Sequence, residues 1–191
     1  MPNPSRYFRL RPDMRRGKWS LGEPLNGQGQ EVEDIREFTS GRPAHVEGRL
    51  TLTIDEPGKK LDYSTAGAGM SPVVNIRVAA LFTELVPDDV QLIPVDIKGC
   101  PDGYQILVAT KLIRCIDDEA SEEALYWQPE DERPDKLGMY RSVYGMRIDR
   151  TKVGGAKVFR TWGWSVALIV SEDIKLALER AKVTGAKFEE V

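Results

Sequence analysis

The chain has 191 residues, of which 41% are apolar, and this is enough for one substantial core or for one core with a smaller subdomain. Its 27 basic and 30 acidic residues give a formal net charge of −3, so the chain as a whole does not attract nucleic acid or an anionic membrane. No apolar run approaches the roughly 20 residues that cross a bilayer, and the two cysteines, Cys100 and Cys115, are too few for a disulfide framework. We therefore expect a cytoplasmic protein with no direct nucleic-acid or membrane binding.

The first third of the chain is predicted to be rich in short strands and loops. Strands are predicted at Tyr7–Leu10 and at Leu50–Ile54, where apolar residues alternate with threonines. The segment Gly22–Gln30 reads GEPLNGQGQ, a composition typical of a loop. We expect residues 1–70 to form a β/loop-rich portion, a candidate subdomain, packed on a core domain formed by residues 71–191.

The middle of the chain predicts one helix followed by a hairpin. Ser71-Pro72 predicts the helix start, because serine caps helices and proline is tolerated at the first helical position. Apolar residues then recur at helical spacing until Pro87, on a face broad enough to pack on more than one side. Strands at Val90–Ile97 and Tyr104–Ile116 are predicted to be joined by a turn over residues 99–103. Pro94 indicates that the first of them is an edge strand or contains a bulge.

The final third contains the most regular patterns. Val143–Ile148 is predicted to be a strand, and Lys157–Val170 a long central strand with apolar residues on both faces. Ser171 precedes a helical stripe with acidic residues in its first turn, and Gly185 suits the helix C-terminus. Phe188 is expected to return into the core. The predicted fold class is α+β, a largely antiparallel sheet with two principal helices and an N-terminal irregular layer.

Few residues point to catalysis or metal binding. The single histidine, His45, has no nucleophile motif near it and is predicted to lie in a loop. Gly67-Ala68-Gly69 precedes the predicted helix but lacks the third glycine of a dinucleotide-binding fingerprint, so we interpret it as a flexible approach to the helix. The paired carboxylates Asp88-Asp89 and Asp117-Asp118 have no further ligands at metal-site spacing. We expect no catalytic residue, no cofactor and no metal.

Two segments have strongly unbalanced charge. Ser5–Lys18 has six basic residues and one aspartate, and we expect it to neutralise the acidic segment Asp117–Asp135 of the same chain or to be a solvated terminus. Contact with a phosphate backbone is the alternative. Asp117–Asp135 has nine acidic residues against one arginine, with Tyr126 and Trp127 at its middle and a short helix predicted over Ala120–Leu125.

The acidic segment has two interpretations. It is either a solvated loop or a recognition surface, in which aromatic rings supply the desolvated centre while carboxylates steer a basic partner. The recognition surface is the hypothesis that we carry forward. Its candidate residues are Asp117, Asp118, Glu122, Tyr126, Trp127, Glu130 and Asp131.

From about Ser71 to the C-terminus, the chain resembles a family of bacterial immunity proteins. The resemblance lies in the phrases DVQLIPVDI, GYQILVATKLIRCID, PDKLGMYRSVYGMRID and GGAKVFRTWGWSVALIVSEDIKLALE. Such proteins belong to polymorphic-toxin systems, and the type member comes from myxobacteria and is paired with a nuclease toxin. The resemblance implies a cytoplasmic antidote, a monomer or a homodimer, that binds a cognate protein toxin and occludes its active or substrate-binding surface.

Two other functions stay open at this point. The first is an enzyme whose site combines two carboxylates with Arg150 or Arg160, which would require a concave pocket where these groups converge. The second is a structural or adaptor module that dimerises through exposed aromatic residues.

Overall fold

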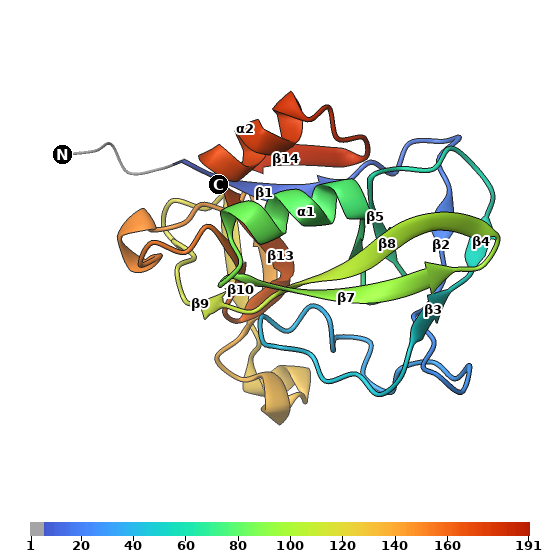
Figure 1. Cartoon of the computed structure of the whole chain (residues 1–191). Helices are drawn as coiled ribbons and strands as arrows, with labels where there is room; N and C mark the ends of the chain where they lie inside the picture. The colour runs from blue at the N-terminus through green and yellow to red at the C-terminus, as the bar shows by residue number, and fades with distance from the viewer. Residues whose placement is uncertain (1–5) are drawn as a thin grey trace.

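The computed structural model describes residues 6–191, which form an α+β fold with two β-sheets, a separate hairpin and two α-helices (Figure 1). The five-stranded sheet has the order β14 (Ala186–Glu190), β1 (Tyr7–Pro12), β13 (Trp164–Ser171), β12 (Val158–Thr161) and β9 (Leu112–Ile113). The seven-stranded sheet has the order β3 (Leu50–Leu52), β7 (Val90–Ile97), β8 (Cys100–Ala109), β6 (Ser71–Asn75), β5 (Tyr63–Ala66), β2 (Ser20–Leu21) and β4 (Ile54–Glu56).

The remaining elements are short. The separate hairpin pairs β10 (Glu123–Tyr126) with β11 (Tyr140–Tyr144), and the helices are α1 (Ile76–Leu85) and α2 (Glu172–Arg180). Single 3₁₀ turns occupy Pro129–Asp131, Pro134–Lys136 and Arg150–Lys152. Most strand pairs are antiparallel; the parallel pairs are β3–β7, β2–β5 and β9–β12. Within residues 6–191, no helix is long and apolar enough to cross a membrane.

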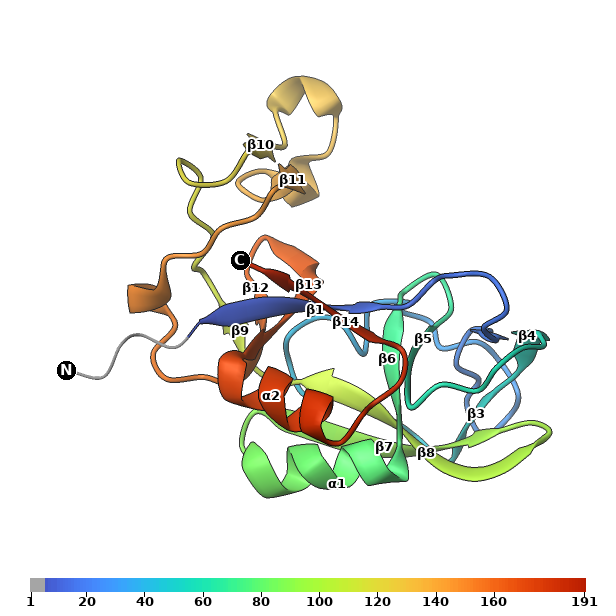
Figure 2. The same ribbon diagram turned by 90° about the horizontal axis from the view of Figure 1, so that it is seen from above.

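The central core lies between the two sheets and is closed by both helices, which lie on the same side of the molecule in Figure 2. Complete burial of a large apolar side chain stabilises the folded chain by about 2 kcal/mol. This core therefore joins the sheets and helices into one layered structure. Its members include Phe8 and Val170 from the five-stranded sheet, Val74 and Leu107 from the seven-stranded sheet, and Phe82 and Ile174 from the helices.

The outer face of each sheet has a core of its own. Residues from the N-terminal third, among them Trp19 and Phe38, cover the outer face of the seven-stranded sheet. Phe159 and Ile169 on the outer face of the five-stranded sheet pack against residues that follow β9, such as Tyr140. Of the region Lys157–Val170, predicted to be covered on both faces, residues 158–161 and 167–170 are buried, whereas Val166 near the hairpin turn is 57% exposed.

The prediction that α1 begins at Ser71 is wrong. Residues 71–75 form β6, because they pair with β5 on one side and with β8 on the other. The helix starts at Ile76, and the side chain of Asn75 caps it by accepting a 2.9 Å hydrogen bond from the Arg77 amide. The helix also packs on one side only, since Ile76 is 58% exposed.

Several predicted strands are divided by turns. Lys157–Val170 forms a hairpin, in which Gly163 takes a positive φ of 79° between β12 and β13. Tyr104–Ile116 is interrupted after Ala109, and the turn before β8 lies at Lys98-Gly99. The strand predicted at Val143–Ile148 is displaced to β11. The helix predicted over Ala120–Leu125 is absent, because residues 120–122 form a turn and residues 123–125 belong to β10.

Other predictions agree with the structure. The strand at Tyr7–Leu10 is present, and Ser171 is the N-cap residue of α2, although its hydroxyl contacts Asp173 instead of a backbone amide. The prediction that Gly185 caps this helix, however, is wrong, because α2 ends at Arg180 and Gly185 lies in the loop before β14. Strand β7 has a bulge after Val95, and Pro94 lies beyond the part of β7 that pairs with β3. Both cysteines are free and buried.

Candidate functional site

Residues 114–149, here called the arm, project from the body of the protein. Figure 2 shows β10 and β11 at its outer part, while its inner side chains, among them Val143 and Met146, pack against Phe159 and Ile169 on the outer face of the five-stranded sheet. A bridge between Ile116 and Ile148 closes the base of the arm, where both side chains are buried. In the sequence, the arm lies between β9 and β12, and it contains the whole acidic segment Asp117–Asp135.

A hydrogen-bond network around the exposed carboxylate of Asp118 stabilises the arm. The Asp118 carboxylate accepts 2.5 Å hydrogen bonds from the hydroxyls of Tyr126 and Tyr140, whose rings stack with centroids 4.5 Å apart. Burial, together with the neighbouring Asp118 charge, raises the pKa of both phenols. Both tyrosines therefore stay neutral and act as donors at physiological pH. Asp118 and Tyr126 contribute in this way to the conformation of the arm.

Two other candidate carboxylates, those of Asp117 and Asp131, accept hydrogen bonds from nearby backbone amides of the arm. Asp117 Oδ1 accepts hydrogen bonds from the amides of Glu119 (3.1 Å) and Ala120 (3.0 Å), which fixes the turn that replaces the predicted helix. Asp131 accepts from the amide of Gln128 at 2.9 Å, which caps the first 3₁₀ turn. Its second oxygen receives a 2.9 Å bond from Arg141 on β11.

Most carboxylates of the acidic segment have no cationic partner. Within the described residues, Asp131 pairs with Arg141 and Asp135 with Arg133, while the other seven of the nine form no ion pair within 4.0 Å. Arg133 lowers the pKa of Asp135 through a hydrogen bond. The side chains of Glu122 and Glu130 are exposed and make no hydrogen bond in the described structure. The arm therefore presents a negative outer surface.

Trp127 lies on a different, basic side of the arm. Its ring is half-buried and has three cations near it, with Lys136 Nζ at 4.7 Å from the ring centroid and the Cζ atoms of Arg141 and Arg133 at 5.8 and 5.9 Å. Such contacts stabilise the ring where it is. Two of these cations, Arg133 and Arg141, are themselves paired with Asp135 and Asp131 of the acidic segment.

A groove of about 350 Å³ separates this side of the arm from the body. The arm, the β12–β13 turn and the N-terminal layer all contribute to its wall, so residues far apart in the sequence meet there. The buried indole N–H of Trp164 has no acceptor among the described residues. The groove is basic and aromatic, and its lining includes Arg36, Arg42, Trp127, Lys136, Arg141, Trp162 and Trp164.

A family model described as "Immunity protein family (Imm11)" matches residues 7–191. The chain belongs to this family. The Imm11 match confirms the resemblance. It begins at Tyr7, at the start of β1, and not only at Ser71, so the family model also covers the N-terminal layer. No curated protein matches the chain.

The seven predicted interface residues all lie on the arm of this Imm11 protein, but the structure does not bring them into one patch. Asp117, Asp118, Tyr126 and Asp131 make the internal contacts described above, whereas Glu122 and Glu130 are free on the outer surface. No sequence pattern predicts the basic groove, because its residues come from separate segments of the chain. Trp162 and Trp164 of this groove belong to the segment Lys157–Val170, whose pattern predicts a central strand.

The other candidates of the Imm11 chain occupy unremarkable positions. His45 is exposed, and only its backbone amide is fixed, by Glu37 at 2.7 Å. Residues 67–70 form a turn between β5 and β6, so the glycines do not precede a helix. Within residues 6–191, no group of three or more His, Cys, Asp or Glu could hold a metal ion.

The N-terminal basic segment pairs with acids other than those of the arm. Ser5 lies outside the described residues. Arg6 pairs with Glu172, Arg11 with Glu189 at 3.2 Å, and Arg15 with Asp13 at 2.7 Å. The expectation that this segment neutralises the acidic segment is therefore wrong for Arg6, Arg11 and Arg15.

Proposed function

We propose that this Imm11 protein is an antidote that binds a cognate bacterial toxin and covers its active or substrate-binding surface. In this proposal the toxin is a nuclease of a polymorphic-toxin system, and the antidote acts in the cytoplasm without catalysis or a cofactor. Membership of the immunity family supports the antidote role. One observation supports the mode of binding: a projecting arm carries seven carboxylates without cationic partners. A surface that holds nucleic-acid phosphates is basic, and these carboxylates would attract it.

We place the toxin contact on the arm, at the residues that the sequence singled out. Glu122 and Glu130 supply free carboxylates, and Trp127 supplies an aromatic ring at the edge of the groove. Asp117, Asp118, Tyr126 and Asp131 hold the arm in its conformation. A half-buried tryptophan at the centre of an interface contributes strongly to binding, so Trp127→Ala is expected to weaken the complex by about 2 kcal/mol, roughly thirtyfold in Kd.

The first experiment identifies the partner. The tagged protein is used to capture proteins from a lysate of its source organism, and each stoichiometric partner is then expressed in a host with and without the immunity protein. The proposal expects one partner that is toxic alone, degrades nucleic acid and is harmless when co-expressed. A toxic partner with another activity would overturn the nuclease assignment and leave the antidote role intact.

The second experiment tests the surface. The triple variant Glu119→Lys, Glu122→Lys, Glu130→Lys reverses three exposed carboxylates that make no ion pair, so it leaves the internal contacts of the arm unchanged. We expect a slower association rate and a weaker salt dependence of binding. The matched control reverses Glu47, Glu56 and Glu84, which are exposed elsewhere and have no ion pair among residues 6–191. Equal effects of both triple variants would contradict the placement on the arm.

A further inference from the structure

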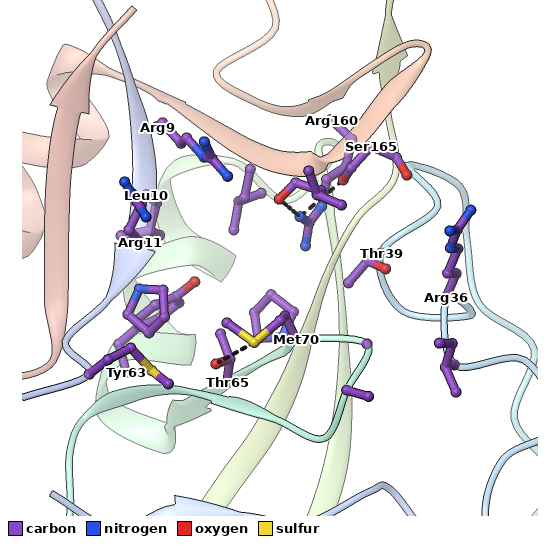
Figure 3. A pocket seen from close by; sticks show the side chains of 18 residues that line it. Arg9, Leu10, Arg11, Arg36, Thr39, Tyr63, Thr65, Met70, Arg160 and Ser165 are labelled. Carbon is purple, nitrogen blue, oxygen red and sulfur yellow. Dashed lines mark hydrogen bonds between the residues drawn. The ribbon is translucent and has the colours of Figure 1, made fainter. Parts of the chain in front are cut away.

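Arg160 of β12 is a buried arginine whose guanidinium is only partly hydrogen-bonded. The residue is 3% exposed and points from the five-stranded sheet into the space between the sheets (Figure 3). Its Nη1 donates to the backbone carbonyls of Ser165 and Val166, both at 3.2 Å. Its Nε and Nη2 atoms are buried and have no partner in residues 6–191. Buried polar groups are nearly always hydrogen-bonded, so these free donors indicate an acceptor that the chain itself does not supply.

Arg160 lines a cavity of about 320 Å³, and Figure 3 shows its side chain directed toward that space. Figure 3 shows Arg9 directed toward the same space from β1, while Tyr63 lies on the opposite side. Four arginines line the cavity, and none of its described lining residues is Asp or Glu. Arg11 is paired with Glu189, but Arg9 and Arg160 have no carboxylate within 4.0 Å among residues 6–191.

The electrostatics of the cavity favour an anion. Burial lowers the pKa of Arg160 to about 10, and burial followed by the charge of Arg11 lowers the pKa of Arg9. Both guanidinium groups nevertheless stay charged at neutral pH, and a buried cation without a counter-ion is costly. Burial raises the pKa of Tyr63 to about 12, so its phenol is a neutral donor there. A planar oxyanion would satisfy the Arg160 fork and neutralise the site at once.

Part of the cavity wall is apolar, while the hydroxyl residues Thr39, Thr65 and Ser165 also line it. Leu10, Pro72 and Leu168 line it beside the arginines, and the exposed side chains of Met14 and Met70 also contribute to it. Ligand sites commonly combine such an apolar wall with a few charged groups in a volume of this size. The two carboxylates that an Arg160-centred enzyme site would require do not line this cavity in the described structure.

We propose that this cavity binds a small organic anion, with its carboxylate or phosphate group between Arg160 and Arg9 and its apolar part against Leu10 and Leu168. This site goes beyond the proposed antidote function and does not depend on it. The anion would make hydrogen bonds to the free Nε and Nη2 donors and would stabilise the packing of β1 and β12 against the seven-stranded sheet.

The test is a titration of the full chain followed by nitrogen-15 NMR of the arginine Nε–H groups, at constant ionic strength maintained with sodium chloride. The probes are inorganic phosphate, acetate and hexanoate, which separate the two head groups and the contribution of the apolar wall. We expect saturable binding of at least one head group and a shift of the Arg160 Nε–H resonance. If the carboxylate is the preferred head group, hexanoate is expected to bind more tightly than acetate. Comparison with Arg160→Lys assigns that resonance.

The variants make the result specific to the cavity. Arg160→Met and Arg9→Gln are each expected to weaken binding roughly tenfold or more, because each removes a charged hydrogen-bond donor. Arg42→Gln, which removes an exposed arginine of the neighbouring groove, is expected to leave binding unchanged. If Arg160→Met does not fold, the binding affinity of Arg9→Gln and the Arg160 Nε–H resonance of the wild type still test the proposal. No binding beyond the chloride control, or equal binding by Arg9→Gln and the wild type, would overturn the proposal.

Discussion

A single carboxylate joins two tyrosines from different strands of the arm. Asp118 accepts hydrogen bonds from both Tyr126 and Tyr140, and Tyr140 is only 6% exposed. We predict that Tyr140→Phe destabilises the protein by about 2 kcal/mol, because it removes a hydrogen bond to a charged group at a buried position. The measurement is the free energy of unfolding from urea denaturation.

Strand β11 also offers a matched control for this substitution. Tyr144 lies four residues further on, is 68% exposed and makes no side-chain hydrogen bond in the described structure. Tyr144→Phe is therefore expected to change the free energy of unfolding by less than about 0.5 kcal/mol. If both variants lose the same stability, the network does not stabilise the arm, and Asp118 would be free to contact a partner.

At the scale of elements, Asp62 connects the start of β5 to two other parts of the fold. Its Oδ2 atom accepts hydrogen bonds from the amide and the hydroxyl of Thr184, both at 2.9 Å, in the loop between α2 and β14. The same oxygen accepts from Arg77 of α1 at 3.0 Å. Burial alone would raise the pKa of Asp62, but the bonds from Thr184 and Arg77 together outweigh it, and the folded pKa is lowered.

This lowered pKa predicts a pH dependence with a definite sign. A group with a lower pKa in the folded state stabilises the protein above its unfolded pKa of about 3.9, and this contribution is lost as the pH falls through the folded value. We predict that Asp62→Asn is less stable than the wild type at neutral pH and that the difference shrinks below about pH 4. Urea denaturation from pH 2 to 7 measures it. Asp88→Asn, at an exposed position without contacts, should show no such trend.

An element can be predicted from the sequence when residues close together in the chain are enough to determine it. Helix α2 has acidic residues in its first turn and a clear apolar stripe, and it forms where the pattern predicts. The start of α1 was predicted four residues early, because Val73 and Val74 fit a helical stripe as well as a buried strand. Pairing of residues 71–75 with β5 and β8 decides between the two, and this pairing is a tertiary fact that no local window contains.

The candidate site depends even more on contacts between residues that are distant in the sequence. The acidic segment is visible in the sequence as a charged surface, and the structure places its free carboxylates on the exposed arm. The contact of Asp118 with Tyr140 spans 22 residues, so composition could not reveal that this carboxylate is hydrogen-bonded within the arm. The same holds for Arg160, because its missing counter-ion becomes evident only when the residues around it in space are known.

At the scale of the whole molecule, the N-terminal third is part of both sheets. Strand β1 lies inside the five-stranded sheet, between β14 and β13, and forms backbone pairs with both. Strands β2 to β5 pair with one another and with β6 and β7 in the seven-stranded sheet. Residues 1–70 and 71–191 were expected to form a layer and a core domain, and this division stays a prediction. The strand pairing favours one cooperative unit.

We predict that a fragment comprising residues 71–191 does not fold by itself. It would lack β1, so β13 and β14 would be left without their shared neighbour, and Phe8 and Leu10 would be missing from the central core. We expect weak near-ultraviolet circular dichroism and no cooperative thermal transition for this fragment, whereas the full chain unfolds in one transition. Adding a peptide of residues 1–70 should restore the transition by returning β1 to its position. A fragment that unfolds cooperatively at the midpoint of the full chain would show instead that residues 71–191 form an independent domain, and that the N-terminal layer can be removed without loss of the core.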